Sequence, residues 1–220
     1  MASASRNCKP AFSCGHVAVQ LADRNHLNQR CCSTPRTRSA TVPQLTLWRT
    51  VVSSLRTIDD AHLFALGNTI AELLITHGQT IVCAESCTGG WISKVLTDIP
   101  GSSTWFECGV VAYSYEAKEA LLGVQPHTLE RTGAVSQETV VEMVSGALAR
   151  YGAGVAVAVT GIAGPGGDTP GKPVGTVWIG WKRRGGYARS EQFHFDGDRE
   201  AVRRQTVHAA LEGVRRILTS

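Results

Sequence analysis

Long hydrophobic runs are missing from this 220-residue sequence. No apolar stretch approaches the roughly 20 residues that a helix needs to span a bilayer, so we expect no membrane partner. The sequence also lacks a large excess of either charge, because its formal net charge is only +4. Hydrophobic residues nevertheless make up 43% of the chain, and there are 23 glycines. This length and composition predict one domain with a buried α/β core, plus a tail.

The sequence also lacks a cysteine pattern that would support disulfides or a structural metal. Its seven cysteines are odd in number, repeat no spacing and form no pair of C-x-x-C motifs. Disulfide-rich secreted domains and zinc modules depend on such spacings. We therefore expect reduced cysteines, a cytoplasmic location, no structural zinc and no cofactor.

Acidic residues are nearly absent from residues 1–56, which carry eight Lys or Arg and only Asp23. Residues 57–220 carry fourteen basic and seventeen acidic side chains, which argues against a nucleic-acid partner. Three interpretations of the basic stretch stay open: a disordered extension, an organelle transit peptide, or a wrongly assigned start. A true downstream start would need a non-standard codon, because no methionine lies between Met1 and Met143. In all three cases we expect the domain to occupy residues 57–220.

Periodic patterns within the domain predict alternating strands and helices. Capping residues support several of the helices: Ser114, Ser136 and Asp198 each precede an apolar-periodic segment. The predicted helices cover residues 59–78, 91–98, 114–122, 136–152 and 198–218, and the predicted strands cover 80–84, 109–113, 155–159, 174–181 and 189–195. Because the last two strands suit an antiparallel pair, we expect a three-layer α/β/α sandwich with a mixed sheet.

The segment Ala84–Gly90 is the most informative part of the sequence. It joins a β-branched strand to a helix that starts at Trp91, through a small polar turn with two adjacent glycines. Such a junction can hold a serine hydroxyl at a sharp bend and point free backbone N–H groups at its surroundings. The alternative is an ordinary loop in which Ser86 or Thr88 caps the helix.

Lys118 is a second candidate for chemistry. It stands four residues after Ser114, not three as in the Ser-x-x-Lys motif, so the local motif fails. It can still meet a serine from another loop, because strand ends converge at one edge of an α/β sheet. The alternative is a solvated helix lysine.

Glycine-rich and acidic segments near the C-terminus offer weaker signals. Residues 166–172 match the first half of a Walker A loop, but Pro173 and a following strand exclude a P-loop. They leave a Gly/Pro loop that can close over a ligand. Residues 160–166 suit a nest of N–H donors for an anion. We interpret residues 194–198 as a turn and a helix cap rather than a metal site.

Taken in order, these segments resemble the CinA C-terminal domain family, the nicotinamide-nucleotide amidases. The resemblance covers about residues 60–218. It departs from the family pattern at Tyr115, where Asn is usual, and at Cys108, where Gly is frequent. The matching runs are Ala84–Gly90, Gly101–Ser103 with Trp105 and Phe106, Tyr113–Ser114 with Lys118, Leu121–Val124, Gly133–Ser136, Thr160–Pro165, Lys172–Val177 and Gly197–Arg199.

The resemblance implies hydrolysis of the carboxamide of nicotinamide mononucleotide to nicotinate mononucleotide and ammonia. Ser86 would attack the carbonyl carbon, and a buried, neutral Lys118 would take the serine proton. Tyr113 would relay that proton or orient Lys118. Backbone N–H groups of residues 86–90 or 160–161 would bind the oxyanion. No metal is required.

The nucleotide would be bound by glycine loops and an arginine. The substrate-binding residues that we expect are Thr88, Gly89, Gly90, Thr160, Gly161, Gly164 and Arg203, with the arginine and N–H groups on the phosphate. We also expect a homo-oligomer. Two other functions stay open: a nucleotide-binding module without turnover, and a regulatory module associated with competence or recombination.

Overall fold

A computed structural model describes residues 58–220, so the predictions for residues 1–56 lie outside the described residues. The sheet consists of β1 (Ile81–Glu85), β2 (Phe106–Val111), β3 (Val155–Gly161), β4 (Thr176–Arg183) and β5 (Arg189–His194). Their order is β2-β1-β3-β4-β5. β1 runs parallel to β2 and β3, and the two pairings β3–β4 and β4–β5 are antiparallel.

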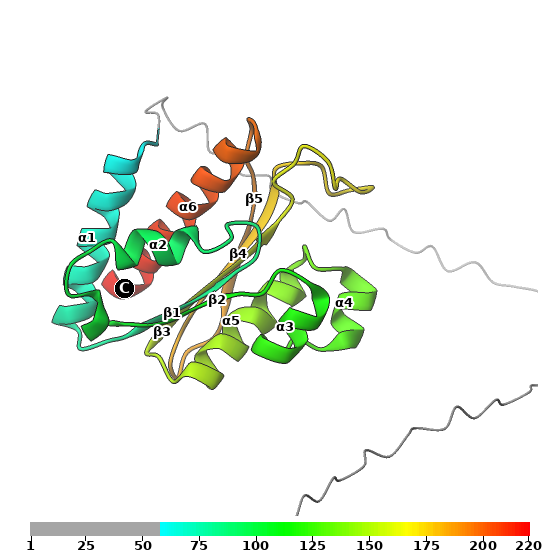
Figure 1. The fold of residues 1–220 in the computed structure, drawn as a ribbon. Helices are drawn as coiled ribbons and strands as arrows, with labels where there is room; N and C mark the ends of the chain where they lie inside the picture. The colour runs from blue at the N-terminus through cyan, green and yellow to red at the C-terminus, as the bar shows by residue number, and fades with distance from the viewer. Residues whose placement is uncertain (1–57) are drawn as a thin grey trace, which may run out of the picture. The chain divides into compact units, whose positions relative to one another are not determined.

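Helices cover both faces of this sheet (Figure 1). They are α1 (Asp60–Thr76), α2 (Trp91–Thr97), α3 (Tyr115–Leu122), α4 (Pro126–Thr132), α5 (Gln137–Tyr151) and α6 (Arg199–Thr219). α1, α2 and α6 pack on one face, and α3, α4 and α5 pack on the other. The predicted three-layer α/β/α sandwich with a mixed sheet is confirmed.

The two central parallel strands explain why the core is continuous. Every residue of β1 is buried, and all of β3 is buried except its last residue. Alternate side chains enter the two helical layers: Ile81 faces α1 and α6, whereas Val82 faces α5. A strand that is covered on both faces needs apolar side chains in nearly every position, which is the pattern of the sequence.

Three predicted caps begin the expected helices. The side chains of Ser114, Ser136 and Asp198 accept hydrogen bonds from the backbone N–H groups three residues later, at the starts of α3, α5 and α6. Each cap satisfies one of the otherwise unpaired amides of the first helical turn. The Ser114 cap also fixes where α3 begins, and therefore where Lys118 lies.

β3 extends two residues beyond the predicted strand 155–159, β4 is shifted by two residues from the predicted strand 174–181, and two other elements differ more. The strand predicted over residues 109–113 covers Phe106–Val111 instead. β2 is an edge strand and most of its residues are partly exposed, so its apolar pattern is too weak to fix the boundaries. The seven-residue α4 was not predicted; Pro126 begins it at a position where proline's missing N–H costs nothing.

Within residues 58–220, no helix combines the length and hydrophobicity that crossing a membrane requires. Over the same residues there is no group of three or more His, Cys, Asp or Glu side chains arranged to hold a metal ion. The three described cysteines, Cys83, Cys87 and Cys108, are all free thiols.

Candidate active site

The candidate active site forms where β1 ends and the chain turns toward α2. The turn of residues 86–90 directly follows Glu85, the last residue of β1. Lys118 belongs to α3, which follows β2, the neighbour of β1 in the sheet. Because the carboxyl ends of parallel strands lie at the same edge, the two segments meet there.

A direct contact joins Ser86 and Lys118. Lys118 Nζ lies 3.1 Å from Ser86 Oγ, and it also donates to the carbonyl oxygens of Ala112 at 2.8 Å and Tyr113 at 3.1 Å. Lys118 is fully buried, so it is not the solvated helix lysine of the alternative interpretation. In a neutral amine, the two carbonyls occupy both N–H groups, and the lone pair faces the serine hydroxyl. This geometry suits proton transfer from Ser86 to Lys118.

Burial brings the pKa of Lys118 into the range of a general base. Loss of solvation disfavours the ammonium form and lowers the pKa from 10.5 to about 8. Burial has the opposite effect on the neighbouring thiol, because it raises the pKa of Cys87 to about 12. Cys87 therefore stays a thiol near neutral pH, so Ser86 is the better candidate for a nucleophile in this turn.

Glu85 holds the turn in place through five hydrogen bonds to its buried carboxylate. Thr88 Oγ1 donates at 2.7 Å, and the amides of Gly90 and Ile92 donate at 2.9 and 3.1 Å. Ser93 donates twice, from its amide at 2.8 Å and its hydroxyl at 2.7 Å. The carboxylate thus occupies the N-terminal donors of α2. These bonds use the Thr88 hydroxyl and the Gly90 amide, which we had expected to contact the substrate phosphate.

The backbone amides of Cys87, Thr88 and Gly89 in this turn do not bond to Glu85. The Gly89 amide donates to the carbonyl of Ser86 at 3.1 Å, which closes a tight turn at a positive φ of 62° that glycine tolerates. The amides of Cys87 and Thr88 have no hydrogen-bond partner among residues 58–220. Both residues are buried, and unpaired amides are costly in buried positions, so these two donors are candidates for binding an oxyanion.

Tyr113 contributes its backbone and its side chain to different contacts. Its carbonyl accepts from Lys118, whereas its exposed hydroxyl accepts from Arg199 Nη2 at 3.2 Å. Arg199 Nη1 also donates to the carbonyl of Gly164 at 2.8 Å. Arg199 therefore connects the phenol to the loop after β3, and the phenol has no direct hydrogen bond to Lys118.

The remaining predicted substrate contacts lie at the end of β3 and on α6. Thr160 Oγ1 donates to the carbonyl of Ala134 at 2.8 Å, so this hydroxyl is already used. Gly161 allows close packing, because a Cβ there would lie 2.7 Å from a methyl group of Val177. Arg203 donates to the carbonyls of Cys87 at 3.1 Å and Thr88 at 2.7 Å.

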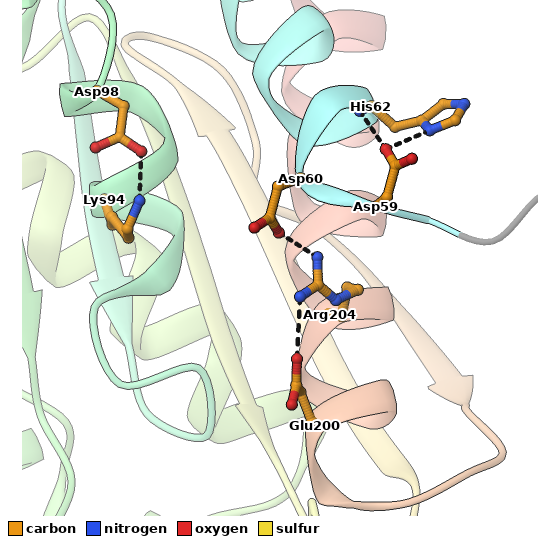
Figure 2. Close-up of polar contacts among 7 residues, drawn as sticks. All are labelled: Asp59, Asp60, His62, Lys94, Asp98, Glu200 and Arg204. Atoms are coloured by element: carbon orange, nitrogen blue, oxygen red, sulfur yellow. Dashed lines mark hydrogen bonds and ion pairs between the residues drawn. The ribbon is translucent and has the colours of Figure 1, made fainter.

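A cleft of about 430 Å³ lies beside the turn, but it is not lined by Ser86 or Lys118. Some of its lining residues form ion pairs: Lys94 contacts Asp98 at 2.5 Å, and Arg204 contacts Glu200 at 3.0 Å and also Asp60 (Figure 2). The lining residues are Asp60, Leu63, Phe64, Gly89, Gly90, Trp91, Lys94, Val95, Asp98, Glu200, Arg203 and Arg204.

Two contributors to the site were missing from the sequence prediction. Glu85 is the one acidic residue of an otherwise apolar buried strand, which is a signal that its carboxylate has a specific partner. Arg199 belongs to one of the motifs that carry the family resemblance, but its contacts with Tyr113 and Gly164 depend on the tertiary fold. The unusual Tyr115 hydroxyl accepts a bond from the Ala134 amide at 3.3 Å, close to this region.

Comparisons with known proteins identify the family of this chain. The CinA C-terminal domain family matches residues 64–218. The nicotinamide-nucleotide amidohydrolase PncC of Pseudomonas putida is 53% identical over 149 residues, which make up 68% of this chain and 92% of that protein. PncC of Escherichia coli K12 is 49% identical over 153 residues, or 70% of this chain and 93% of that protein.

A solved structure shows the same fold. The competence/damage inducible protein CihA from Agrobacterium tumefaciens is 42% identical and has a TM-score of 0.70. The match covers 74% of this chain and 97% of that one.

Proposed function

The chain belongs to the CinA C-terminal domain family, and we propose that it is a nicotinamide-nucleotide amidohydrolase that converts nicotinamide mononucleotide to nicotinate mononucleotide and ammonia. The relatives named for this activity are matched over most of their length. The observation that carries the proposal is the 3.1 Å contact between Ser86 Oγ and a buried Lys118 Nζ. It supplies the activated nucleophile that a poorly electrophilic amide requires.

In the acylation step, Ser86 Oγ attacks the carboxamide carbon and its proton passes to Lys118 Nζ. The amides of Cys87 and Thr88 bind the resulting oxyanion. Collapse of this tetrahedral intermediate breaks the C–N bond, and Lys118 returns the proton to the departing nitrogen, so ammonia leaves. Ser86 is then an ester of the nicotinate group, and Lys118 is again a neutral amine.

In the deacylation step, Lys118 takes a proton from water, and the hydroxide oxygen attacks the ester carbon. Lys118 then protonates Ser86 Oγ as the ester bond breaks, and the nicotinic acid group that is released loses its proton to solvent to become the carboxylate product. The carbonyls of Ala112 and Tyr113 hold Lys118 in one orientation throughout both steps. Of the two roles predicted for Tyr113, relay and orientation, we propose orientation, because its backbone carbonyl contacts Lys118 and its hydroxyl contacts Arg199.

We propose that the substrate phosphate contacts Arg199 and the loop after β3. Arg199 lies between the Tyr113 hydroxyl and the Gly164 carbonyl, and the Ala163 and Gly164 amides have no backbone partner among the described residues. An arginine beside free amides suits a phosphate. Arg199→Gln should raise KM for the nucleotide but not for nicotinamide riboside, which lacks the phosphate. Equal effects on both substrates would contradict this placement.

The test of the function is a direct assay of the purified full-length protein. Incubation with nicotinamide mononucleotide should release ammonia and nicotinate mononucleotide in equal amounts. Ser86→Ala should lower turnover by several orders of magnitude, as expected for loss of a covalent nucleophile. Ser190→Ala, which removes a serine hydroxyl from the distant β5, is the matched control and should keep full activity.

Binding of the nucleotide without release of ammonia would contradict the proposed function. It would favour the non-catalytic nucleotide-binding module instead. The homo-oligomer and the cytoplasmic location stay predictions; sedimentation of the purified protein and fractionation of cells would test them.

A further inference from the structure

Two neighbouring arginines of α6 have different partners. Arg203 and Arg204 both stack on Trp91, with the guanidinium carbons 5.3 and 4.8 Å from the ring centroid. Arg204 pairs with the carboxylates of Asp60 and Glu200 (Figure 2). Among the described residues, Arg203 instead donates to backbone alone, through Nε to the carbonyl of Cys87 and through Nη2 to the carbonyl of Thr88. Because Arg203 bonds to backbone carbonyls just after Ser86, it can fix the orientation of the peptide groups of that turn.

The Cys87 carbonyl and the Thr88 amide belong to one trans peptide unit. In a trans peptide the C=O and N–H groups point in opposite directions, so a bond that fixes the carbonyl also fixes the N–H. The 3.1 Å bond from Arg203 Nε therefore aims the unpartnered Thr88 amide away from α6. A charged donor on the carbonyl also polarises the peptide, which strengthens its N–H as a donor.

The preceding peptide is held in a comparable way. The carbonyl of Ser86 accepts from the Gly89 amide, and its peptide partner, the Cys87 amide, is the other unpartnered donor. The short loop thus keeps both amides free while both carbonyls are anchored. Arg203 supplies the only anchor that comes from outside the turn among these contacts.

We propose that Arg203 is a positioning residue for the oxyanion site, and not a contact of the substrate phosphate. This inference rests on the proposed amidohydrolase function. Arg203 orients and polarises the Cys87–Thr88 peptide, which carries the Thr88 amide, before substrate arrives. It also holds the Thr88–Gly89 peptide, whose N–H bonds the Ser86 carbonyl of the peptide that carries the Cys87 amide. Preorganised donors of this kind favour the transition state over the bound substrate.

The surroundings of Arg203 argue against a phosphate contact. The cleft on its side of the turn contains three basic side chains and three carboxylates, so it offers a dianion little net attraction. Neither Ser86 nor Lys118 lines that cleft. The Thr88 hydroxyl and the Gly90 amide, which would have to help bind the phosphate, are bonded to Glu85.

The first test separates kcat from KM. Arg203→Gln should lower kcat by about 10- to 100-fold, as expected when catalytic donors are displaced rather than removed, and should leave KM nearly unchanged. Arg204→Gln is the matched control, because it removes the neighbouring cation from the same Trp91 ring without touching the turn; its kcat should stay at the wild-type value. A raised KM with an unchanged kcat in Arg203→Gln would overturn the inference and favour a substrate contact.

The second test measures the oxyanion site itself. An analogue with an aldehyde in place of the carboxamide forms a hemiacetal with Ser86, whose oxygen occupies the oxyanion site. Arg203→Gln should weaken inhibition by this aldehyde about 10-fold or more while the affinity for the carboxylate product stays unchanged. Equal losses for both ligands would indicate a general structural role and overturn the inference.

Chemical rescue of Arg203→Ala distinguishes loss of the guanidinium group from loss of stability. Added guanidinium at millimolar concentration should restore part of the kcat of Arg203→Ala, with circular dichroism confirming a folded protein. A folded Arg203→Ala that guanidinium does not rescue would contradict the role of the charge. A wild-type protein that releases no ammonia would instead overturn the proposed function, and this inference with it; an active wild type with full kcat in Arg203→Gln would overturn the inference alone.

Discussion

At the scale of single residues, the environment of one amine determines what the site can do. Lys118 touches Ser86 and two backbone carbonyls and is fully buried. An exposed lysine would be an ammonium at neutral pH and could not accept the serine proton. Burial lowers its pKa to about 8, and the carbonyls direct its lone pair at the nucleophile.

The environment of Lys118 therefore predicts how kcat varies with pH. Lys118 works as a base only when neutral, and its pKa in the folded protein is about 8, so kcat should rise with pH through about 8 and then level off. Lys118→Arg should lower kcat at least about 100-fold, because arginine stays charged at these pH values. The matched control is Lys94→Arg, a change in an exposed lysine paired with Asp98. A kcat independent of pH between about pH 6 and 9 would contradict Lys118 as the base.

At the scale of elements, the sequence predicts those parts whose pattern is local. Ser114 and Asp198 were recognised because an N-cap and its helix lie within a few residues of each other. The buried β1 was recognised because both of its faces are covered and its residues are almost all apolar. The bounds of β2 were predicted wrongly because they are set by its hydrogen-bonded pairing with β1 and not by a pattern in its own sequence.

In the site as well, single residues can be predicted from the sequence, whereas the contacts between them depend on the tertiary fold. The strand–turn–helix pattern predicts Ser86 and the family resemblance predicts Lys118, but their contact joins residues 32 positions apart and depends on the sheet order. From the sequence, Glu85 has no predicted role, and Arg203 is predicted to contact the substrate phosphate. A sequence cannot show that a carboxylate will occupy the first amides of α2, or that an α6 arginine will bond to a turn more than a hundred residues away.

Close packing between α5 and α3 gives a prediction at this scale. A Cβ on Gly146 would lie 1.6 Å from the carbonyl oxygen of Leu122, at the end of the helix that carries Lys118. Gly146→Ala should therefore lower the free energy of unfolding by about 2 kcal/mol or more, because backbone must move, and should also lower kcat. Urea denaturation would measure the loss.

The control for this prediction is another helical glycine. A Cβ on Gly67 would lie 3.0 Å from the terminal methyl of Ile99, which can shift, and at ordinary contact distances of 3.4 and 3.5 Å from two atoms of Val95. Gly67→Ala should change the free energy of unfolding by less than about 1 kcal/mol. Equal stabilities for the two variants would show that the approach of α5 to α3 is not as close as described.

At the scale of the whole molecule, every residue of the proposed site lies within the stretch that the family model matches. The family match covers residues 64–218. A chain that begins near Thr57 should therefore keep the melting temperature of the full-length protein and its kcat on nicotinamide mononucleotide. Differential scanning calorimetry and the ammonia assay would test this. Insolubility or a several-fold loss of kcat would show that the domain boundary lies earlier in the chain.

The central claim is that Ser86, activated by Lys118, forms a covalent ester with the substrate. Rapid mixing of the protein with nicotinamide mononucleotide, followed by acid quenching and mass spectrometry of proteolytic peptides, tests this claim most directly. We predict that the peptide containing Ser86 gains the mass of the substrate minus ammonia, and that Ser86→Ala shows neither this gain nor turnover. An adduct on a different residue, or sustained ammonia release by Ser86→Ala, would contradict the account.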